Sequence, residues 1–224
     1  MSKSARALLF DLDGTLVDSA GGIASALNEA LASRGLGPFD TGAVADMVGG
    51  GVRRLVERAL ARLDAGGEAA LVEDMLAAFL KSYRAAPCRN SPVFPHAHDT
   101  LHRLAEQGAR LGVVTNKPDD ISRAMLTELG LAPMLSAIVG SLPGRALKPA
   151  PDMLQIALGE LGVAPAQALM IGDSAADVGA ARAAGTRVVL LAHGYSHGDV
   201  AALGADAVVP GFADLPAMID ALQH

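Results

Sequence analysis

Short runs of apolar residues recur along the chain, and each ends at a glycine or a polar residue. The run at residues 7–10 is followed by two acids and Gly14, a pattern that predicts a buried strand. Similar runs occupy residues 110–114, 137–139, 168–171, 188–191 and 207–209. Between them, apolar residues repeat at helical spacing and stop at glycines such as Gly130 and Gly162. Strands that alternate with helices predict an α/β fold with a doubly wound, Rossmann-like parallel sheet.

Residues 18–89 break this rhythm, because their apolar positions follow a helical period and no strand pattern interrupts them. Apolar stripes run through residues 23–31, 52–63 and 71–83. We therefore expect a helical cap at residues 18–89, inserted into a catalytic core made of residues 1–17 and 90–224. Hinges near residues 17–20 and 87–92 would let this cap close over the core.

Composition and charge exclude several classes of function. Hydrophobic residues make up 51% of the 224 residues and aromatic residues only 3%, which favours helices packed on a sheet over a β-sandwich. The net charge of −6 and the scarcity of lysine argue against binding to nucleic acid. No apolar run approaches the length of a membrane span and no secretory pattern is evident, so we expect a cytoplasmic protein with no membrane partner. Cys88 is the single cysteine, which excludes an internal disulfide.

Side chains that can take part in catalysis or ligand binding follow the predicted strands, at the sheet edge where open parallel sheets bind ligands. They are Asp11, Asp13, Thr115, Asn116, Lys148, Asp173 and Asp177. Two ionised carboxylates about 4 Å apart repel each other by roughly 4 kcal/mol at an effective dielectric constant of about 20, so such a cluster needs a cation. Oxygen ligands with room for water suit Mg²⁺, which would let a carboxylate approach a phosphoryl group. The set predicts phosphoryl transfer to an aspartate, with Lys148 and Thr115 stabilising the transferring oxygens.

Four stretches of the sequence carry a specific resemblance. DLDGTLVDS, VVTNKP, LKPAPD and IGDSAADVGAARAAG, in this order and spacing, resemble the four motifs of the haloacid dehalogenase superfamily of phosphohydrolases. The segment between the first two resembles the helical cap of the phosphoglycolate phosphatase branch, so the likeness covers nearly the whole chain. It implies a Mg²⁺-dependent phosphomonoester hydrolase that forms an aspartyl phosphate and acts on a small phosphorylated metabolite.

The resemblance assigns roles to the acids of the first and fourth motifs. Asp11 would be the nucleophile, and Asp13 the acid that protonates the leaving oxygen and then activates water. Mg²⁺ would be held by Asp11, the backbone carbonyl of Asp13, and Asp173, with Asp177 acting through water or from behind these ligands. A helix cap is the alternative for Asp173, and a surface helix position is the alternative for Asp177.

The same resemblance assigns phosphate binding to Thr115, Asn116 and Lys148. Helix caps are the alternatives for Thr115 and Asn116, and a solvated surface position is the alternative for Lys148. Lys117 also lies in the second motif, and we interpret it as a surface residue.

The cap is expected to select the organic part of the substrate. The stretch at residues 48–60 resembles the VGNGA…ERAL segment of phosphoglycolate phosphatases, with Gly50 in place of an asparagine. Free amides around Gly50 and the guanidinium of Arg53 or Arg54 would bind a substrate carboxylate. The alternative is a glycine turn followed by solvent-facing arginines. Besides 2-phosphoglycolate, the candidate substrates include sugar phosphates, pyrophosphate and nucleotides.

Two stretches that contain histidine are not assigned a specific role by the sequence. His96, His98 and His102 include a pair at helical spacing, but no acidic motif lies near them and a zinc site is not expected. Pro95–His96 also departs from the PG that phosphoglycolate phosphatases more often carry at this position. Residues 193–195 resemble a YGY stretch of that branch, with a plain loop as the alternative.

Several other activities compete with the phosphatase. Asp13 counts against a haloalkanoate dehalogenase, and a phosphonatase would need a Schiff-base lysine in the cap, where only Lys81 is present. A β-phosphoglucomutase-like phosphotransferase keeps both Asp11 and Asp13 and stays open. A receiver-type phospho-aspartate signalling protein uses similar side chains in another chain order and needs no cap. The oligomeric state is left open by the sequence.

Overall fold

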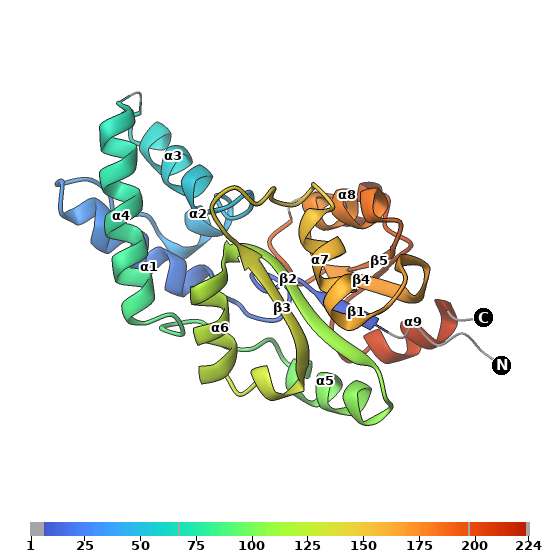
Figure 1. The fold of residues 1–224 in the computed structure, drawn as a ribbon. Helices are drawn as coiled ribbons and strands as arrows, with labels where there is room; N and C mark the ends of the chain where they lie inside the picture. Colours follow the sequence, from blue (N-terminus) through green and yellow to red (C-terminus); the bar gives the residue numbers. More distant parts are fainter. Residues whose placement is uncertain (1–6, 67, 197, 223–224) are drawn as a thin grey trace.

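A parallel sheet forms the centre of the computed structural model, which describes residues 7–66, 68–196 and 198–222 (Figure 1). Its six strands lie in the order β3-β2-β1-β4-β5-β6. They span Ala7–Phe10 (β1), Arg110–Pro118 (β2), Leu135–Ser141 (β3), Ala168–Gly172 (β4), Arg187–Leu191 (β5) and Ala207–Val209 (β6). The predicted α/β fold is confirmed, and each predicted strand is present. β2 continues beyond the predicted end at residue 114 because polar residues, which the apolar pattern does not register, extend it to Pro118.

Helices cover both faces of the sheet, as a doubly wound fold requires. One face packs against α7 (Asp152–Leu161) and α8 (Ala175–Ala184). The other face packs against α5 (Ala97–Glu106), α6 (Asp119–Glu128) and α9 (Leu215–Leu222). Short 3₁₀ helices lie at Ala132–Met134, Pro165–Gln167 and Val200–Leu203. Within the described ranges, no helix is both long enough and apolar enough to cross a bilayer.

Strand β1 lies at the middle of the sheet and is buried along its whole length. It pairs with β2 on one side and β4 on the other, and its residues are at most 1% exposed. Leu8 and Phe10 join one apolar core and Leu9 joins the other, since successive strand side chains point to opposite faces. Phe10 also stacks on Phe212 with ring centroids 6.3 Å apart. This packing fixes the place where the chain leaves the sheet, and therefore the position of Asp11.

The chain between β1 and α5 is helical. It forms α1 (Ala20–Ala32), α2 (Thr41–Ala45), α3 (Val52–Arg62) and α4 (Ala69–Ala85), which lie together to one side of the sheet (Figure 1). The three predicted apolar stripes correspond to α1, α3 and α4. The short helix α2 was not expected, because Val44 is its one buried residue and leaves no periodic pattern. It begins where the Asp40 side chain accepts a hydrogen bond from the Ala43 N–H (2.7 Å).

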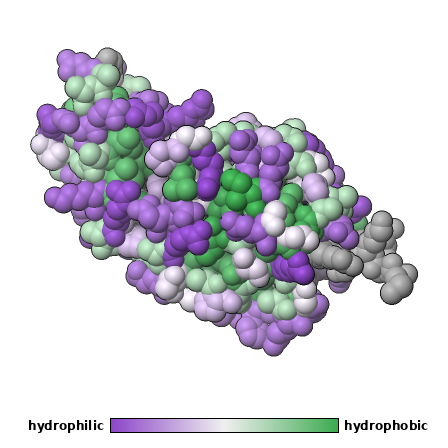
Figure 2. Space-filling view, in the orientation of Figure 1, coloured by the Kyte–Doolittle hydropathy of each residue, from purple (hydrophilic) through white to green (hydrophobic). Residues whose placement is uncertain are grey.

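Two connecting segments join this helical part to the rest of the chain and run side by side. The Asp18 N–H donates to the Pro92 carbonyl (2.9 Å), and the Phe94 N–H donates to the Leu16 carbonyl (3.0 Å). Apolar side chains of α1, α3 and α4 belong to the same buried cluster as one face of the sheet, and hydrophobic side chains are visible where the two parts meet (Figure 2). The division into a cap and a core stays a prediction, and the paired segments are where its hinge would lie.

Candidate active site

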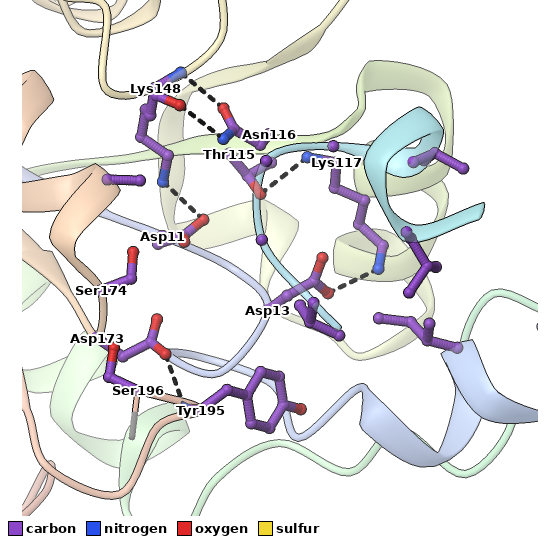
Figure 3. Close-up of a pocket in the computed structure, with 18 of the residues that line it drawn as sticks. Asp11, Asp13, Thr115, Asn116, Lys117, Lys148, Asp173, Ser174, Tyr195 and Ser196 are labelled. Atoms are coloured by element: carbon purple, nitrogen blue, oxygen red, sulfur yellow. Dashed lines mark hydrogen bonds and ion pairs between the residues drawn. The ribbon is translucent and has the colours of Figure 1, made fainter. Parts of the chain in front are cut away.

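The carboxyl ends of β1 and β4 meet where the strand order of the sheet reverses. The Asp11 N–H donates to the Ile171 carbonyl of β4 (2.9 Å), and Asp173 directly follows the end of β4. Open α/β sheets bind ligands at such a switch point. A cavity of about 130 Å³ lies here, lined by Asp11, Asp13 and Asp173 on the sheet side and by residues of α3 and α4 opposite (Figure 3). Parts of the chain predicted to be core and cap therefore both contribute to the site.

Three buried carboxylates crowd together at these strand ends. Oxygen atoms of Asp11, Asp173 and Asp177 lie within 4.8 Å of one another. Burial, reinforced by the charge of Asp177, raises the pKa of Asp173 to about 8. Burial also raises the pKa of Asp11 to about 6, although the Lys148 ammonium beside it acts in the opposite direction. The protein alone thus compensates this negative charge incompletely, and a hard divalent cation with oxygen ligands fits the cluster.

Lys148 provides the positive charge within this cluster. Its Nζ lies 2.9 Å from Asp11 Oδ1, 2.6 Å from Asp177 Oδ1 and 2.9 Å from the Val114 carbonyl oxygen. Burial by itself lowers the pKa of Lys148, but the two carboxylates outweigh it and raise that pKa above its ordinary value. The predicted surface alternative is wrong, because the side chain is only 1% exposed. All three N–H groups of the ammonium have protein acceptors, so Lys148 holds the Asp11 carboxylate in place rather than presenting a free donor to a ligand.

Asn116 and Thr115 occupy the end of β2, beside Lys148. The Asn116 amide donates to the Lys148 carbonyl (3.0 Å) and accepts from the Lys148 N–H (2.8 Å). Its side chain therefore fixes the loop that carries Lys148 (Figure 3). Thr115 is buried and lines the cavity, and its hydroxyl oxygen accepts from the Lys117 N–H (3.3 Å). Neither residue caps a helix in this arrangement.

Asp177 lies on the first turn of α8 and is fully buried, so the surface-helix alternative is wrong. Its Oδ2 accepts from the Asp173 N–H (3.2 Å) and from both the N–H (3.0 Å) and the hydroxyl (2.7 Å) of Ser174. Its Oδ1 accepts from Lys148. Because both oxygens are engaged in this way, Asp177 acts as the support that orients Asp173 and Lys148.

Asp173 is held by residues from both ends of the chain. Oδ1 accepts from the Thr15 hydroxyl (3.1 Å) and Oδ2 accepts from the Tyr195 N–H (2.8 Å; Figure 3). Gly194 allows this close approach, since a Cβ there would lie 2.1 Å from the Cβ of Asp173. The Tyr195 hydroxyl accepts from the Ala20 N–H at the start of α1 (2.8 Å). Within the loop at residues 193–195, Tyr195 therefore lines the cavity and its backbone N–H holds Asp173.

Asp13 lies apart from the carboxylate cluster and has its own partners. Its Oδ1 accepts from the Ser19 hydroxyl (2.6 Å) and from Lys117 Nζ (2.7 Å; Figure 3). Lys117 is only 4% exposed, so its predicted surface position is wrong. It is drawn inward by the charge of Asp13 and by the ring of Tyr83 on α4, whose centroid lies 4.4 Å from Nζ.

Comparison with protein families matches residues 8–191 to the haloacid dehalogenase-like hydrolase family. This match spans more than half of the chain and includes the ends of β1, β2 and β4. The chain belongs to the haloacid dehalogenase-like hydrolases. The family resemblance predicted from the four motifs is therefore confirmed.

Relatives of this hydrolase carry a consistent name. A phosphoglycolate phosphatase of Rhodospirillum rubrum is 45% identical over 214 residues, covering 94% of this chain and 89% of the relative. One of Yersinia pseudotuberculosis is 40% identical, covering 95% and 92%. The crystal structure of a predicted phosphoglycolate phosphatase from Haemophilus somnus superposes with a TM-score of 0.88 at 31% identity, covering 97% of this chain and 99% of that one. Family and relatives together indicate a phosphatase.

The cap residues expected at the substrate are not both brought to the site of this hydrolase. Gly50 lines the cavity. Arg53 points elsewhere and forms an exposed ion pair with Glu73 of α4 (2.6 Å), so the expected contact with a substrate carboxylate is not made in this arrangement. The physical reason is the helical phase of α3, which turns Arg53 toward solvent and Leu55 toward the cavity.

The three histidines near α5 stay outside the site. His96 precedes α5 with a left-handed backbone (φ 64°), and His102 pairs with Glu106 one turn away (3.5 Å). Within the described ranges, the acidic cluster at the strand ends is the one group of three potential metal ligands.

The sequence analysis did not predict a role in the site for three residues, Thr15, Tyr83 and Lys117. Thr15 stands in the first motif, but its contact with Asp173 spans 158 positions of the chain. In the sequence, Tyr83 is the last position of an apolar helical stripe, and this pattern does not indicate a role for its hydroxyl. The available signal for Lys117 was its place directly after Thr115 and Asn116, the pair expected to bind phosphate, since β2 carries it toward the same sheet edge.

Proposed function

We propose that this hydrolase is a Mg²⁺-dependent phosphomonoesterase that cleaves 2-phosphoglycolate through a phosphoryl group carried by Asp11. The observation that carries the proposal is the position of Asp11, at the end of β1, buried against Lys148 and beside Asp173. The names of the relatives support the substrate. The cytoplasmic location stays a prediction from the sequence.

Asp11 has one carboxylate oxygen already engaged and one that is available. Oδ1 accepts from the Leu12 N–H (2.7 Å) and pairs with Lys148 (2.9 Å). Oδ2 has no hydrogen-bond donor among the described residues. In the proposed first step Oδ2 forms a bond to phosphorus while the ester P–O bond breaks, and the electron pair of that bond stays on the leaving oxygen. Lys148 orients the carboxylate throughout and favours its ionised form.

In this proposal Asp13 transfers the proton in both steps. It follows Asp11 by two positions and lines the same cavity, yet it is bound by a separate set of donors. A protonated Asp13 gives its proton to the leaving oxygen and then, as a carboxylate, takes a proton from the water that attacks phosphorus. That attack breaks the bond between phosphorus and Asp11 Oδ2, so inorganic phosphate leaves and the Asp11 carboxylate is restored.

Mg²⁺ fits the acidic cluster described above. The side chains of Asp11 and Asp173 and the backbone carbonyl of Asp13 would hold it, with Asp177 supporting Asp173. When bound, the ion supplies positive charge that offsets the repulsion between a carboxylate nucleophile and an anionic phosphoryl group. The Thr15 hydroxyl and the Tyr195 N–H each donate to one oxygen of Asp173 and so fix the orientation of its carboxylate.

Phosphate release by the purified protein tests this proposal. We expect hydrolysis of 2-phosphoglycolate to exceed that of glucose phosphates, pyrophosphate and nucleotides at least about tenfold in kcat/KM. EDTA should lower the rate at least about 100-fold, and added Mg²⁺ should restore it. The variant Lys81→Met serves as a control, because Lys81 is exposed and does not line the cavity. It should hydrolyse the same substrates as wild type.

Other outcomes of the same assay have definite meanings. Full activity in EDTA would contradict the metal-dependent mechanism, and preference for another ester would replace the substrate. Conversion of one sugar phosphate into another without phosphate release would favour the mutase alternative. A receiver-type protein would keep its phosphoryl group instead of turning it over, and the match to a hydrolase family counts against it.

A further inference from the structure

The ammonium of Lys117 has a hydrogen-bond donor for which no described residue provides an acceptor. Its Nζ donates to Asp13 Oδ1 (2.7 Å) and to the Tyr83 hydroxyl oxygen. A lysine ammonium has three N–H groups, so one is left without an acceptor in the part of the chain that the structure describes. Lys148 differs in this respect, because three protein acceptors surround its Nζ.

Tyr83 leaves a second donor at the same place. Its oxygen accepts from Lys117, and its own O–H has no acceptor among the described residues. The Tyr83 ring lies on α4 and is buried, with the hydroxyl reaching the Lys117 ammonium at the boundary between α4 and the sheet. The unused N–H and O–H thus belong to two neighbouring atoms, Lys117 Nζ and the Tyr83 hydroxyl oxygen. A carboxylate offers two oxygens that match such a pair of donors.

The surroundings of this donor pair are buried and apolar, so a donor without an acceptor there costs free energy. The Lys117 side chain is 2% exposed, and the nearby cavity wall is built from Ile23, Leu55 and Phe79. An apolar wall supplies no acceptor for such a donor. An anionic group of a ligand would supply that acceptor. Among the residues that line the cavity, Lys117 and Lys148 are the two cations, and Lys148 is already committed to carboxylates.

The donor pair lies on the leaving-group side of the site. Lys117 contacts Asp13, the residue that protonates the leaving oxygen, whereas Lys148 contacts Asp11, the residue that attacks phosphorus (Figure 3). A group that Lys117 binds therefore belongs to the alcohol half of the ester. In 2-phosphoglycolate that half carries a carboxylate bonded directly to the ester CH₂ carbon.

We propose that Lys117, with the Tyr83 hydroxyl, binds the carboxylate of the leaving group and so selects phosphorylated short hydroxy acids over phosphate esters whose leaving group is uncharged. The proposal rests on the proposed phosphatase function and replaces Arg53, which points to solvent, as the carboxylate-binding residue. It also gives α4 a defined part in specificity, since Tyr83 supplies this helix's hydrogen bond to the substrate carboxylate.

The test compares two substrates that differ in this carboxylate. The values of kcat and KM for 2-phosphoglycolate and ethyl phosphate are measured at saturating Mg²⁺ for wild type, Lys117→Met and the matched exposed control Lys81→Met. Loss of a charged hydrogen bond predicts a fall in kcat/KM for 2-phosphoglycolate of roughly 10- to 100-fold, carried mainly by KM. Ethyl phosphate turnover also falls, because Asp13 loses a partner, but at least about tenfold less. Lys81→Met should match wild type on both substrates.

Equal losses on the two substrates would overturn the proposal, because Lys117 would then serve the phosphoryl group or Asp13 alone. Unchanged KM for 2-phosphoglycolate would overturn it as well. Tyr83→Phe keeps the ring and removes the O–H, and we expect the same selective loss at a smaller size, about three- to tenfold. This second variant decides the question if Lys117→Met does not fold, as judged by circular dichroism.

The rates at which the wild-type protein hydrolyses the two esters test this inference and the proposed function separately. A protein that hydrolyses ethyl phosphate as well as 2-phosphoglycolate would remain a phosphatase, and the carboxylate site would be disproved. A protein that releases phosphate from neither ester would contradict the proposed function itself.

Discussion

The substitution Asp11→Asn is expected to lower kcat for 2-phosphoglycolate at least about 10⁴-fold while leaving the protein folded. The amide oxygen can still accept hydrogen bonds from the Leu12 N–H and Lys148, but it is a poor nucleophile toward phosphorus. The fold should persist because the change removes a negative charge from a cluster in which burial already raises the pKa of this carboxyl. Initial rates and thermal unfolding of the same preparation measure the two effects.

The control for this variant is Asp220→Asn, the same chemical change at an exposed position of α9. It should retain wild-type kcat. Slow deamidation would regenerate aspartate at position 11, so intact mass and peptide mapping must accompany the assay. Wild-type turnover by a preparation proven to carry asparagine would remove Asp11 from the role of nucleophile.

The second large effect is expected from Lys148→Met. This substitution leaves the carboxylates of Asp11 and Asp177 buried without their shared cation, and breaking a buried pair in this way costs about 3–5 kcal/mol. Urea denaturation in EDTA should therefore show a lower free energy of unfolding by this amount. We also expect kcat to fall at least about 10³-fold, because the nucleophile loses both its orientation and a positive charge near the transferring oxygens.

Lys81→Met is the matched control for Lys148→Met, since it removes the same charge from an exposed site on α4. Its stability should stay within about 0.5 kcal/mol of wild type. A Lys148→Met protein that unfolds at the wild-type urea concentration would show that the acidic cluster does not depend on this ammonium.

The strands and the acids were predictable because their signals are local. The run at residues 7–10 is fully buried in β1, and the two acids that follow it stand at the sheet edge that a parallel sheet uses for ligands. The apolar stripes of α1, α3 and α4 were visible for the same reason. The helix α2 has one buried residue and offered no such pattern.

The roles of the lysines were less accessible from the sequence, because they depend on contacts between distant positions. Lys117 meets Asp13 across 104 positions and Tyr83 across 34, and no spacing rule connects them. Lys148 was expected to bind phosphate, and only the structure reveals that all its donors are occupied. Sequence patterns indicated which side chains gather, whereas the geometry decides which hydrogen-bonding atoms remain free for a ligand.

The central claim, that Asp11 carries the phosphoryl group, is tested most directly by trapping it. Protein mixed with 2-phosphoglycolate and Mg²⁺ is quenched in acid within milliseconds and reduced with borohydride, which converts an aspartyl phosphate to homoserine. Trypsin then releases the peptide of residues 7–34, and fragmentation distinguishes position 11 from Asp13 and Asp18. We predict homoserine at position 11, formed only with substrate present. Phosphate release without modification at position 11 at any quench time, or with modification at another residue, would contradict the account.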